Sequence, residues 1–298
     1  MPFVTALAVA RSPKFDLDKA PVRWNPGPPF ESLDLRPGRV VLIGAPPGAG
    51  KTTLSLQLLT NVLERYPQLC GIVGNVETAP EVLLEKLISR LATVPLDAIQ
   101  DRTMTSDERS RVDAAIGAHA DVLGRMAFLE EPYTIDHLRK TMTEFQAELV
   151  VVDYAQRFAS GEGQDERQKL DALMSKVRKL ASKGSCVIVI SSVSRGKGAN
   201  GASSYTGLSL ASFRGSAEFE FGADSAYILD CVPEGVSTLR CEKSRFRQQR
   251  DIPLRFCGTL QRFESGDVLD GFDVAPAQGT SPGLKARPPR KKGGKEGT

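Results

Sequence analysis

The eight residues Ala-Pro-Pro-Gly-Ala-Gly-Lys-Thr at positions 45–52 constrain the fold of this chain more than any other feature. They follow a short apolar run, residues 39–43, and precede a helical pattern over residues 51–66 whose apolar positions share one face. Gly48 and Gly50 allow backbone N–H groups to turn inward at the positive end of that helix, where phosphate oxygens bind. The strand, loop and helix together predict a P-loop that binds and hydrolyses a nucleoside triphosphate.

The residues of this loop have separate expected roles. Lys51 reaches the β and γ phosphates, and the Thr52 hydroxyl can ligate Mg²⁺. The usual pattern begins with Gly where this chain has Ala45, although Gly44 stands one place earlier. The alternative is a chance Gly-rich turn, which would not require the strand and helix on either side. The residues expected to contact ATP are Ala45, Pro46, Pro47, Gly48, Ala49, Gly50, Lys51, Thr52 and Thr53.

Buried strands separated by helices are predicted along most of the chain. Apolar runs without alternation lie at 71–76, 126–129, 148–153 and 186–191, and helical patterns begin at Pro80 and cover 101–124, 134–145 and 166–183. Such strands need crossover connections and form a mostly parallel sheet with helices on both faces. The last strands, at 224–229, 238–243 and 251–256, have no helices between them, which predicts an antiparallel edge. We therefore expect one α/β domain over residues 31–275, with ligands at the carboxyl ends of its strands.

Two segments flank this domain. Residues 1–30 are broken by prolines and are predicted to be an extension, a candidate arm that docks on another subunit through Trp24 and Phe30. Residues 276–298 carry six of the chain's 39 Lys and Arg residues and one of its 36 acidic residues, so the basic excess lies in this tail. The tail has no apolar periodicity and is predicted to be disordered. It either tethers the protein to nucleic acid phosphates or is a solubilising end.

Composition argues against zinc-binding and membrane classes. Five cysteines have no Cys-x-x-Cys spacing and the chain has only two histidines, so we expect buried reduced thiols and no zinc site. No apolar run approaches the length of a membrane span, and the short apolar stretch at the N-terminus has no basic residue before it. We expect a cytoplasmic protein without a membrane partner.

Two acids end apolar strands near the P-loop. Asp153 follows the strand at 149–152, and a carboxylate there would hold Mg²⁺ together with Thr52. Glu77 ends the strand that follows the P-loop helix, where it could orient and deprotonate the attacking water. An acid that simply begins the next helix is an equally good interpretation of Glu77.

Basic residues later in the chain have three interpretations. Arg214 follows the Gly- and Ser-rich residues 195–212, and Lys243 and Arg245 lie at the end of a predicted strand. These side chains could stabilise charge on the γ-phosphate, as an arginine finger does, or contact nucleic acid. The third interpretation, a solvated basic face, is the favoured one for any single residue of this kind.

Taken in order, these segments resemble the RecA-like C-terminal motor domain of the DnaB replicative helicases. The resemblance runs from about Leu35 to Phe263. It rests on Gly-Ala-Pro-Pro-Gly-Ala-Gly-Lys-Thr-Thr at 44–53, Val-Glu-Thr at 76–78, Val-Asp-Tyr-Ala-Gln at 152–156, Phe-Arg-Gly-Ser-Ala-Glu-Phe-Glu-Phe-Gly-Ala-Asp at 213–224 and Lys-Ser-Arg at 243–245. Five motifs in this order are far more specific than a P-loop alone.

The resemblance implies a role for each motif. Lys51 and Glu77 would be catalytic, with Glu77 as the base, and Asp153 would lie at the Mg²⁺ site. Lys243 and Arg245 would act in the ATP site of a neighbouring subunit, which implies a homo-oligomer, a ring or helical hexamer. Single-stranded DNA would bind in the central channel, mainly through its backbone. The implied nucleic acid contacts are Arg214, Gly215, Ser216 and Ala217.

Two departures from the family pattern affect the expected function. The segment at 190–195 has Ser192 where the family has a glutamine that senses the γ-phosphate, so Ser192 and Arg195 are the candidate sensor residues. In addition, only residues 1–30 stand in the place of the helical N-terminal domain through which the replicative helicases meet primase. This favours a phage, plasmid or mobile-element relative with its own partner protein, or a RecA-like ATPase with another role.

Three hypotheses follow for the function. The first is a DnaB-like DNA helicase motor that couples ATP hydrolysis to movement along single-stranded DNA. The second is a nucleotide-switched, DNA-binding assembly ATPase that recruits partners without unwinding. The third is a recombinase-like filament former. Strand displacement separates the first two, and the shape of the assembled particle separates the third.

Overall fold

A computed structural model of the chain describes residues 4–12, 16–158, 165–194, 196–197, 203–205, 208–213, 217–231 and 236–266. The predicted tail at 276–298 lies outside these residues, as do Arg195, Arg214, Gly215 and Ser216. The other candidate site residues lie within them.

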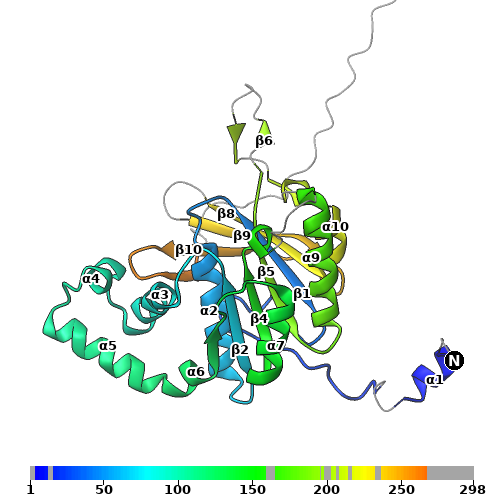
Figure 1. The fold of residues 1–298 in the computed structure, drawn as a ribbon, viewed down its shortest axis with the longest axis horizontal. Coiled ribbons are helices and arrows are strands. Elements are labelled where there is room, and N and C mark those ends of the chain that lie inside the picture. The colour runs from blue at the N-terminus through cyan, green and yellow to red at the C-terminus, as the bar shows by residue number, and fades with distance from the viewer. Residues whose placement is uncertain are drawn as a thin grey trace, which may run out of the picture. The chain divides into compact units, whose positions relative to one another are not determined.

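In the part of the chain that the structure describes, nine strands form one sheet in the order β11-β10-β9-β8-β1-β5-β4-β2-β3 (Figure 1). Their bounds are Val40–Ala45 (β1), Cys70–Asn75 (β2), Met126–Phe128 (β3), Ala147–Asp153 (β4), Cys186–Ser192 (β5), Ser225–Cys231 (β8), Val236–Ser244 (β9), Ile252–Cys257 (β10) and Arg262–Ser265 (β11). Strands β3 to β8 in that order pair in parallel, and β9, β10 and β11 pair antiparallel. The predicted mostly parallel sheet with antiparallel edge strands is confirmed.

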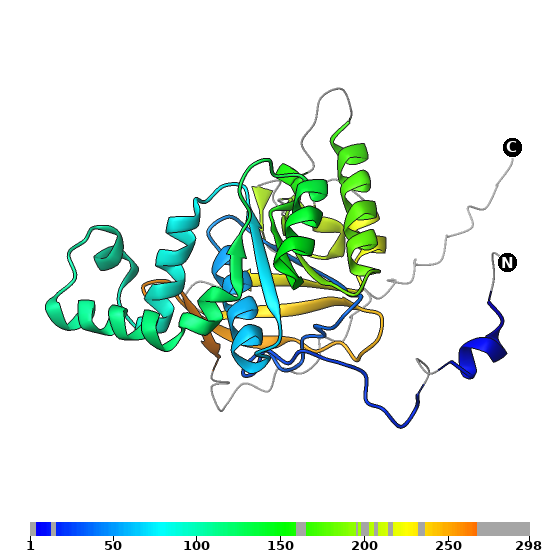
Figure 2. The ribbon, with the colours of Figure 1, turned by 60° about the horizontal axis from the view of Figure 1, so that its bottom comes forward.

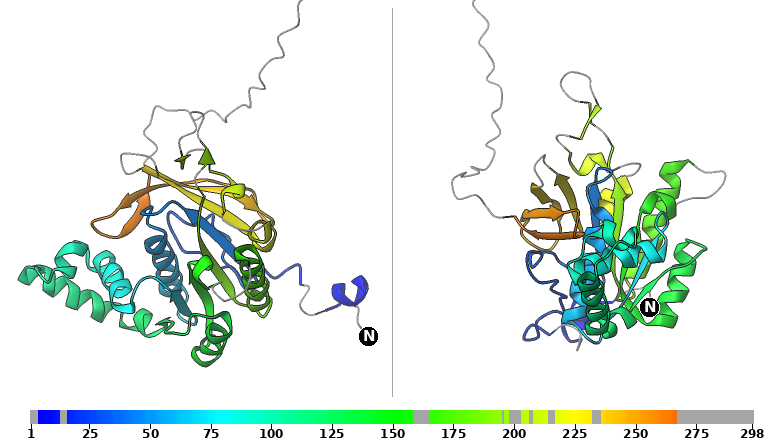
Figure 3. Two further views of the ribbon diagram at one scale, coloured as in Figure 1. Left: turned by 45° about the horizontal axis from the view of Figure 1, so that its top comes forward. Right: turned by 90° about the vertical axis from the view of Figure 1, so that its left-hand side faces the viewer.

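Both faces of the sheet are covered. Successive side chains of a strand point to opposite faces, so each strand contributes to two cores. In β1, Val41, Ile43 and Ala45 join a core with α2 (Lys51–Arg65) and the segment at 24–35, whereas Val40 and Leu42 join a second core. The second core holds α7 (Ile135–Phe145), α8 (Ala155–Phe158), α9 (Glu166–Ala181) and α10 (Ala217–Gly222). The right-hand view of Figure 3 shows the segment at 24–35 and α9 on opposite sides of the sheet. The helices predicted at 51–66, 134–145 and 166–183 are confirmed.

Helices α3 (Pro80–Ala92), α4 (Leu96–Gln100), α5 (Ser106–Ala118) and α6 (Ala120–Gly124) form a group beside α2 (Figures 1 and 2). They have a small core of their own that includes Ile88, Ile99 and Val112. The polar stretch predicted to be helical at 101–124 owes its start to Thr105, whose side chain accepts the N–H of Glu108 while the Glu108 carboxylate accepts the N–H of Thr105.

The residues just before the sheet are part of this chain's own core. Trp24 is 3% exposed and Phe30 is fully buried. The N–H of Trp24 donates to the carbonyl of Leu35 at 2.7 Å, and the N–H of Asn25 donates to the Tyr66 hydroxyl at 2.8 Å. These two aromatic side chains are therefore not free to dock on a neighbouring subunit. A docking arm stays a prediction for the residues before Trp24.

Gly44 occupies a place in β1 where a side chain does not fit. A Cβ atom there would lie 2.5 Å from Phe213 Cε1 and 2.8 Å from Val193 Cγ1. Gly44→Ala should lower the free energy of unfolding by about 1–3 kcal/mol, because these two buried side chains would have to shift.

Gly117→Ala in α5 is the matched control. Apart from the neighbouring residues of its own helix, no described atom lies within 4 Å of a Cβ at this position. Alanine in a helix should therefore raise the free energy of unfolding by about 0.5–1 kcal/mol. Urea unfolding measures both variants, and equal stabilities would contradict the packing of Gly44.

No helix in the described part of the chain is long and apolar enough to cross a membrane. The thiols of Cys186 and Cys241 are free and buried, as expected, whereas those of Cys70 and Cys257 are free but partly exposed.

Candidate nucleotide site

Four parallel strands end together at one edge of the sheet. In the register of the sheet, Ala45 of β1 lies beside Ser192 of β5, and Asn75 of β2 lies beside Asp153 of β4. Strands β4 and β5 pair with each other between them. The P-loop, Ser192, Asp153 and the turn that carries Glu77 are therefore neighbours at the carboxyl edge, where the sequence places them.

The P-loop has the backbone that its glycines permit. Gly48 and Gly50 have φ values of 78° and 83°, in the left-handed region, and Gly50 is the N-cap of α2. Lys51 Nζ donates to the carbonyl oxygens of Ala45 at 3.2 Å and Pro46 at 2.8 Å, so the ammonium group lies over the loop. Pro47 and Gly48 are exposed. The loop therefore presents its backbone at the positive end of a helix, which suits a phosphate group.

The rest of the loop is supported from behind by the β10–β11 hairpin. Ala49 is 6% exposed, and the Thr53 hydroxyl donates to Gln261 Oε1 at 2.7 Å. A Cβ at Gly50 would lie 2.9 Å from the Phe263 ring. The position of the loop thus depends on β10 and β11, the two outermost strands on one side of the sheet, which come last in the described chain.

Asp153 and Thr52 meet directly. The Thr52 hydroxyl donates to Asp153 Oδ2 at 2.6 Å, and Asn75 Nδ2 donates to the same oxygen at 2.7 Å. Asp153 is 3% exposed, and this burial raises the pKa of its carboxyl group, while Thr52, Lys51 and Asn75 favour the ionised form. A hydroxyl and a carboxylate side by side are the hard oxygen donors that Mg²⁺ takes, so these residues fit a magnesium site.

Glu77 lies at the exposed rim of the same edge. Its N–H and that of Thr78 donate to Asn75 Oδ1 at 2.9 Å and 2.8 Å. The pKa of Arg157 is raised by its hydrogen bond to the Tyr154 hydroxyl and also by the charge of Glu77. The Glu77 residue is therefore solvent-accessible, interacts electrostatically with Arg157, and lies two residues beyond the end of the strand that pairs with Asp153.

The structure adds Asn75, which the sequence interpretation passed over. Asn75 is the last residue of β2 and is 5% exposed. A polar residue that ends a buried apolar strand, two residues before a candidate base, was the available signal.

Ser192 lies beside the P-loop strand and is held by Gln156. Gln156 Nε2 donates to the Ser191 hydroxyl at 2.8 Å, and the N–H of Ser192 donates to Gln156 Oε1 at 3.4 Å. The candidate sensor position is thereby joined to the segment that follows Asp153.

The chain beyond Ser192 pairs with the residues that lead into the predicted DNA segment. Val193 forms an antiparallel bridge with Phe213, and the N–H of Ser194 donates to the carbonyl of Ser212 at 2.7 Å. Phe213 is the last described residue before Arg214, and its ring packs on Gly44. The next described residue after Phe213 is Ala217, which begins α10. The residue that directly precedes the segment predicted to contact DNA therefore packs on the P-loop strand.

Arg245 lies at the opposite end of the sheet, and Lys243 lies two residues before it in β9. The N–H of Arg245 donates to the carbonyl of Asp224 at 3.0 Å, and the N–H of Asp224 donates to that of Val40, the first residue of β1, at 2.8 Å. Lys243 is beside Ala226 of β8 in the register. Since β1 has six residues, its two ends are roughly 17 Å apart. That length exceeds an arginine side chain, so Arg245 does not reach the P-loop of its own chain.

The Arg245 side chain is held at this end of the sheet. Its guanidinium donates to the carbonyl of Phe221 and lies 3.8 Å from Asp224 Oδ1. Asp224 is 3% exposed and also pairs with Arg178. The Arg245 side chain is therefore held in a defined position, one strand length from the nucleotide site.

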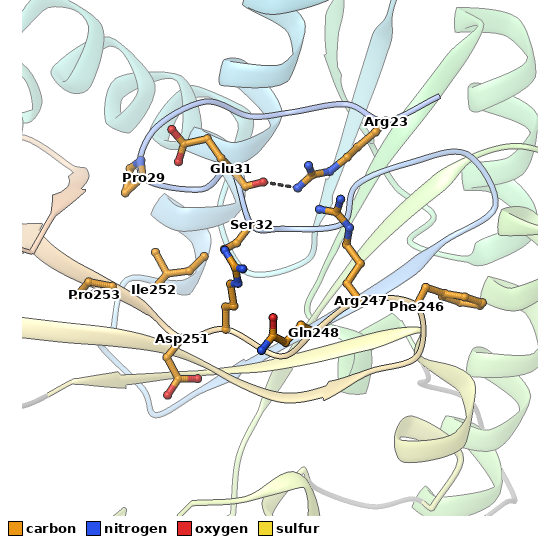
Figure 4. Close-up of a pocket in the computed structure, with 11 residues that line it drawn as sticks. Arg23, Pro29, Glu31, Ser32, Phe246, Arg247, Gln248, Asp251, Ile252 and Pro253 are labelled. Atoms are coloured by element: carbon orange, nitrogen blue, oxygen red, sulfur yellow. Dashed lines mark hydrogen bonds between the residues drawn. The ribbon is translucent and has the colours of Figure 1, made fainter. Parts of the chain in front are cut away.

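A polar groove of about 620 Å³ adjoins the same end of the sheet (Figure 4). It lies between the segment Arg23–Ser32 and the turn from Phe246 to Pro253. Arg23 donates to the carbonyl of Leu33 at 2.9 Å, and burial, together with the charge of Arg247, lowers the pKa of Arg23. The residues that line the groove include none of the P-loop, so it is separate from the nucleotide site.

Comparisons with known proteins show what this chain is similar to. The family model described as the DnaB-like helicase C terminal domain matches residues 32–265. A curated relative, the replicative DNA helicase DnaB of Leifsonia xyli subsp. xyli, is 26% identical over 258 residues, which cover 78% of this chain and 54% of the relative. The chain therefore spans about half the length of that relative.

Two solved structures share the fold. One is an ATPase domain, with a TM-score of 0.66 and 17% identity over 76% of this chain and 84% of that domain. The other is a DnaB-like replicative helicase, described with its interactions with primase, with a TM-score of 0.68 and 17% identity over 77% of this chain and 58% of that one.

Proposed function

Because the chain belongs to the DnaB-like helicase C-terminal domain family, we propose that it is an ATP-hydrolysing motor that moves along single-stranded DNA as a ring of identical subunits. Its substrates would be ATP with Mg²⁺, and its partners would be single-stranded DNA and further copies of this chain. A protein of a replication or mobile-element system is the further partner that we propose, by analogy with the helicase described with primase.

The observation that carries the proposal is the position of two sets of residues at opposite ends of one sheet. Lys51, Thr52, Asp153 and Glu77 lie at the carboxyl edge, and Arg245 lies at the other end, beside Asp224, which is hydrogen-bonded to Val40. In a head-to-tail assembly one end of a subunit faces the other end of the next. Such an assembly would bring Lys243 and Arg245 of one copy to the P-loop of its neighbour.

Each residue then has a defined task in hydrolysis. The P-loop amides and Lys51 bind and orient the phosphates, and Glu77 accepts the proton of the attacking water. Lys243 and Arg245 of the next copy stabilise the charge that develops on the γ-phosphate. Thr52 and Asp153 would hold Mg²⁺, which neutralises phosphate charge when it is bound.

The contact with DNA is proposed for Arg214, Gly215, Ser216 and Ala217. Support comes from Phe213, which directly precedes them and packs on Gly44 of the P-loop strand. A change at the nucleotide could thus be transmitted to the DNA segment through β1 and β5.

Single-stranded DNA should stimulate ATP hydrolysis by the purified protein. The expected dependence on salt is steep, since binding through the phosphate backbone releases counterions. Steady-state hydrolysis with DNAs of several lengths and sequences measures the effect. A rate that no DNA changes, at low salt, would count against a DNA motor.

Ser192 favours a second candidate, a nucleotide-switched assembly factor that binds DNA without unwinding it. This residue lies beside Ala45, and its side chain is shorter than the glutamine that the family has there. A strand-displacement assay separates the two, because ATP-driven unwinding excludes the second candidate. Particle images of six-fold rings, as opposed to open filaments, exclude a filament former.

A further inference from the structure

Asn75 contacts both parts of the proposed hydrolytic centre. Its Nδ2 donates to Asp153 Oδ2 at 2.7 Å, and its Oδ1 accepts the N–H groups of Glu77 at 2.9 Å and Thr78 at 2.8 Å. The residue is 5% exposed. Both ends of the amide are thus engaged inside the protein, where a lost hydrogen bond is not replaced by water.

The first contact fixes the orientation of the Asp153 carboxylate. Oδ2 accepts two hydrogen bonds, one from Asn75 and one from the Thr52 hydroxyl at 2.6 Å. Rotation of the carboxylate would break both bonds and leave the buried Asn75 amide without this acceptor. Asn75 therefore acts with Thr52 to determine which edge of Asp153 faces the phosphate loop.

The second contact fixes the backbone that carries Glu77. An asparagine oxygen that accepts the N–H groups two and three residues later holds the chain in a turn. The N–H of Val76 also donates to the carbonyl of Asp153 at 3.0 Å, which ties the same turn to β4. The exposed Glu77 side chain thus starts from a fixed position.

We propose that Asn75 is a positioning residue that keeps the general base Glu77 and the magnesium ligand Asp153 in one fixed relation. The inference rests on the proposed function of these two residues. One buried amide thereby couples the affinity for the metal to the rate of hydrolysis. Its nitrogen acts on Asp153 and its oxygen on the backbone of Glu77, and substitution can remove the two contacts separately.

Two variants separate the ends. Asn75→Ala removes both contacts, whereas the hydroxyl in Asn75→Ser can still accept an N–H two residues later but is too short to replace the contact with Asp153. Mn²⁺ is the probe for the metal site, and its affinity for the protein–ADP complex is measured by electron paramagnetic resonance. The values of kcat and KM for ATP are measured separately at saturating Mg²⁺.

Asn75→Ala should weaken Mn²⁺ binding about 10-fold and lower kcat by a similar factor, with little change in the KM for ATP. Asn75→Ser should bind Mn²⁺ as weakly as Asn75→Ala but recover most of kcat. A purely structural role would lower only the melting temperature.

Asn25→Ala is the matched control. Asn25 Oδ1 accepts the N–H of Gly27 at 2.8 Å, the same kind of turn contact, in a segment that is not part of the nucleotide site. It should change neither Mn²⁺ affinity nor kcat. The proposal is overturned if Asn75→Ala keeps both values within about twofold of the wild-type protein, or if Asn75→Ser restores both or neither. Failure of the wild-type protein to hydrolyse ATP would instead overturn the proposed function, while Mn²⁺ binding would still test the contact with Asp153.

Discussion

Glu77→Gln should bind ATP normally and hydrolyse it on the order of 10²–10⁴ times more slowly than the wild-type protein. Glutamine keeps the size of the side chain but cannot take a proton from the attacking water. The fold should not change, because Glu77 is exposed and its fixed contact is the backbone N–H that donates to Asn75. Steady-state hydrolysis and binding of a fluorescent ATP analogue measure the two effects separately.

Two further variants serve as controls for Glu77→Gln. Glu81→Gln removes an exposed acid in the first turn of α3, four residues along, and should hydrolyse ATP at the wild-type rate. Lys51→Ala should lose nucleotide affinity as well as hydrolysis, because in the proposed site Lys51 would reach the β and γ phosphates. If Glu77→Gln is as active as Glu81→Gln, Glu77 only begins a helix and the base lies elsewhere.

Arg245→Ala should lower kcat on the order of 10³-fold, with the affinity for nucleotide almost unchanged. The physical reason is that Arg245 lies one strand length from its own P-loop and would meet only the transition state on a neighbouring copy. Nucleotide binding and hydrolysis by the assembled protein measure the two quantities.

Arg250→Ala is the control for charge, since Arg250 is an exposed arginine in the turn that follows β9. It should retain activity. Buried Asp224 keeps Arg178 and the N–H of Val40 as partners when Arg245 is removed, so Arg245→Ala should melt close to the wild-type temperature. An Arg245→Ala variant that hydrolyses ATP as fast as Arg250→Ala would remove this residue from the mechanism.

The fold was predictable where long apolar patterns indicate it. The strands at 40–45, 147–153 and 186–192 are apolar runs long enough to be buried on both faces. Strand β11 escaped prediction because Phe263 is its only apolar residue. Contacts distant in sequence hold it in place: Gln57 of α2 exchanges two hydrogen bonds with the backbone of Phe263, each 2.8 Å long.

Some features of the site were also predictable from the sequence, and others were not. Asp153 and Glu77 could be placed from sequence, because Asp153 ends one apolar strand, Glu77 closely follows another, and parallel strands share their carboxyl edge. The double contact of Asn75 could not, since it depends on the register in which β2 lies beside β4. The distance of Arg245 from the P-loop also follows from pairing, because β9 runs antiparallel to β8 and so ends level with the start of β1.

In the proposed assembly each active site is built from two copies of this chain, and mixing two inactive variants tests this arrangement. Lys51→Ala and Arg245→Ala should each be nearly inactive alone. After random co-assembly of equal amounts, about one quarter of the head-to-tail interfaces should combine an intact P-loop with an intact Arg245 and recover hydrolysis. Mixed oligomers, verified by co-purification of two different tags, that hydrolyse ATP no faster than the separate variants would contradict the claim.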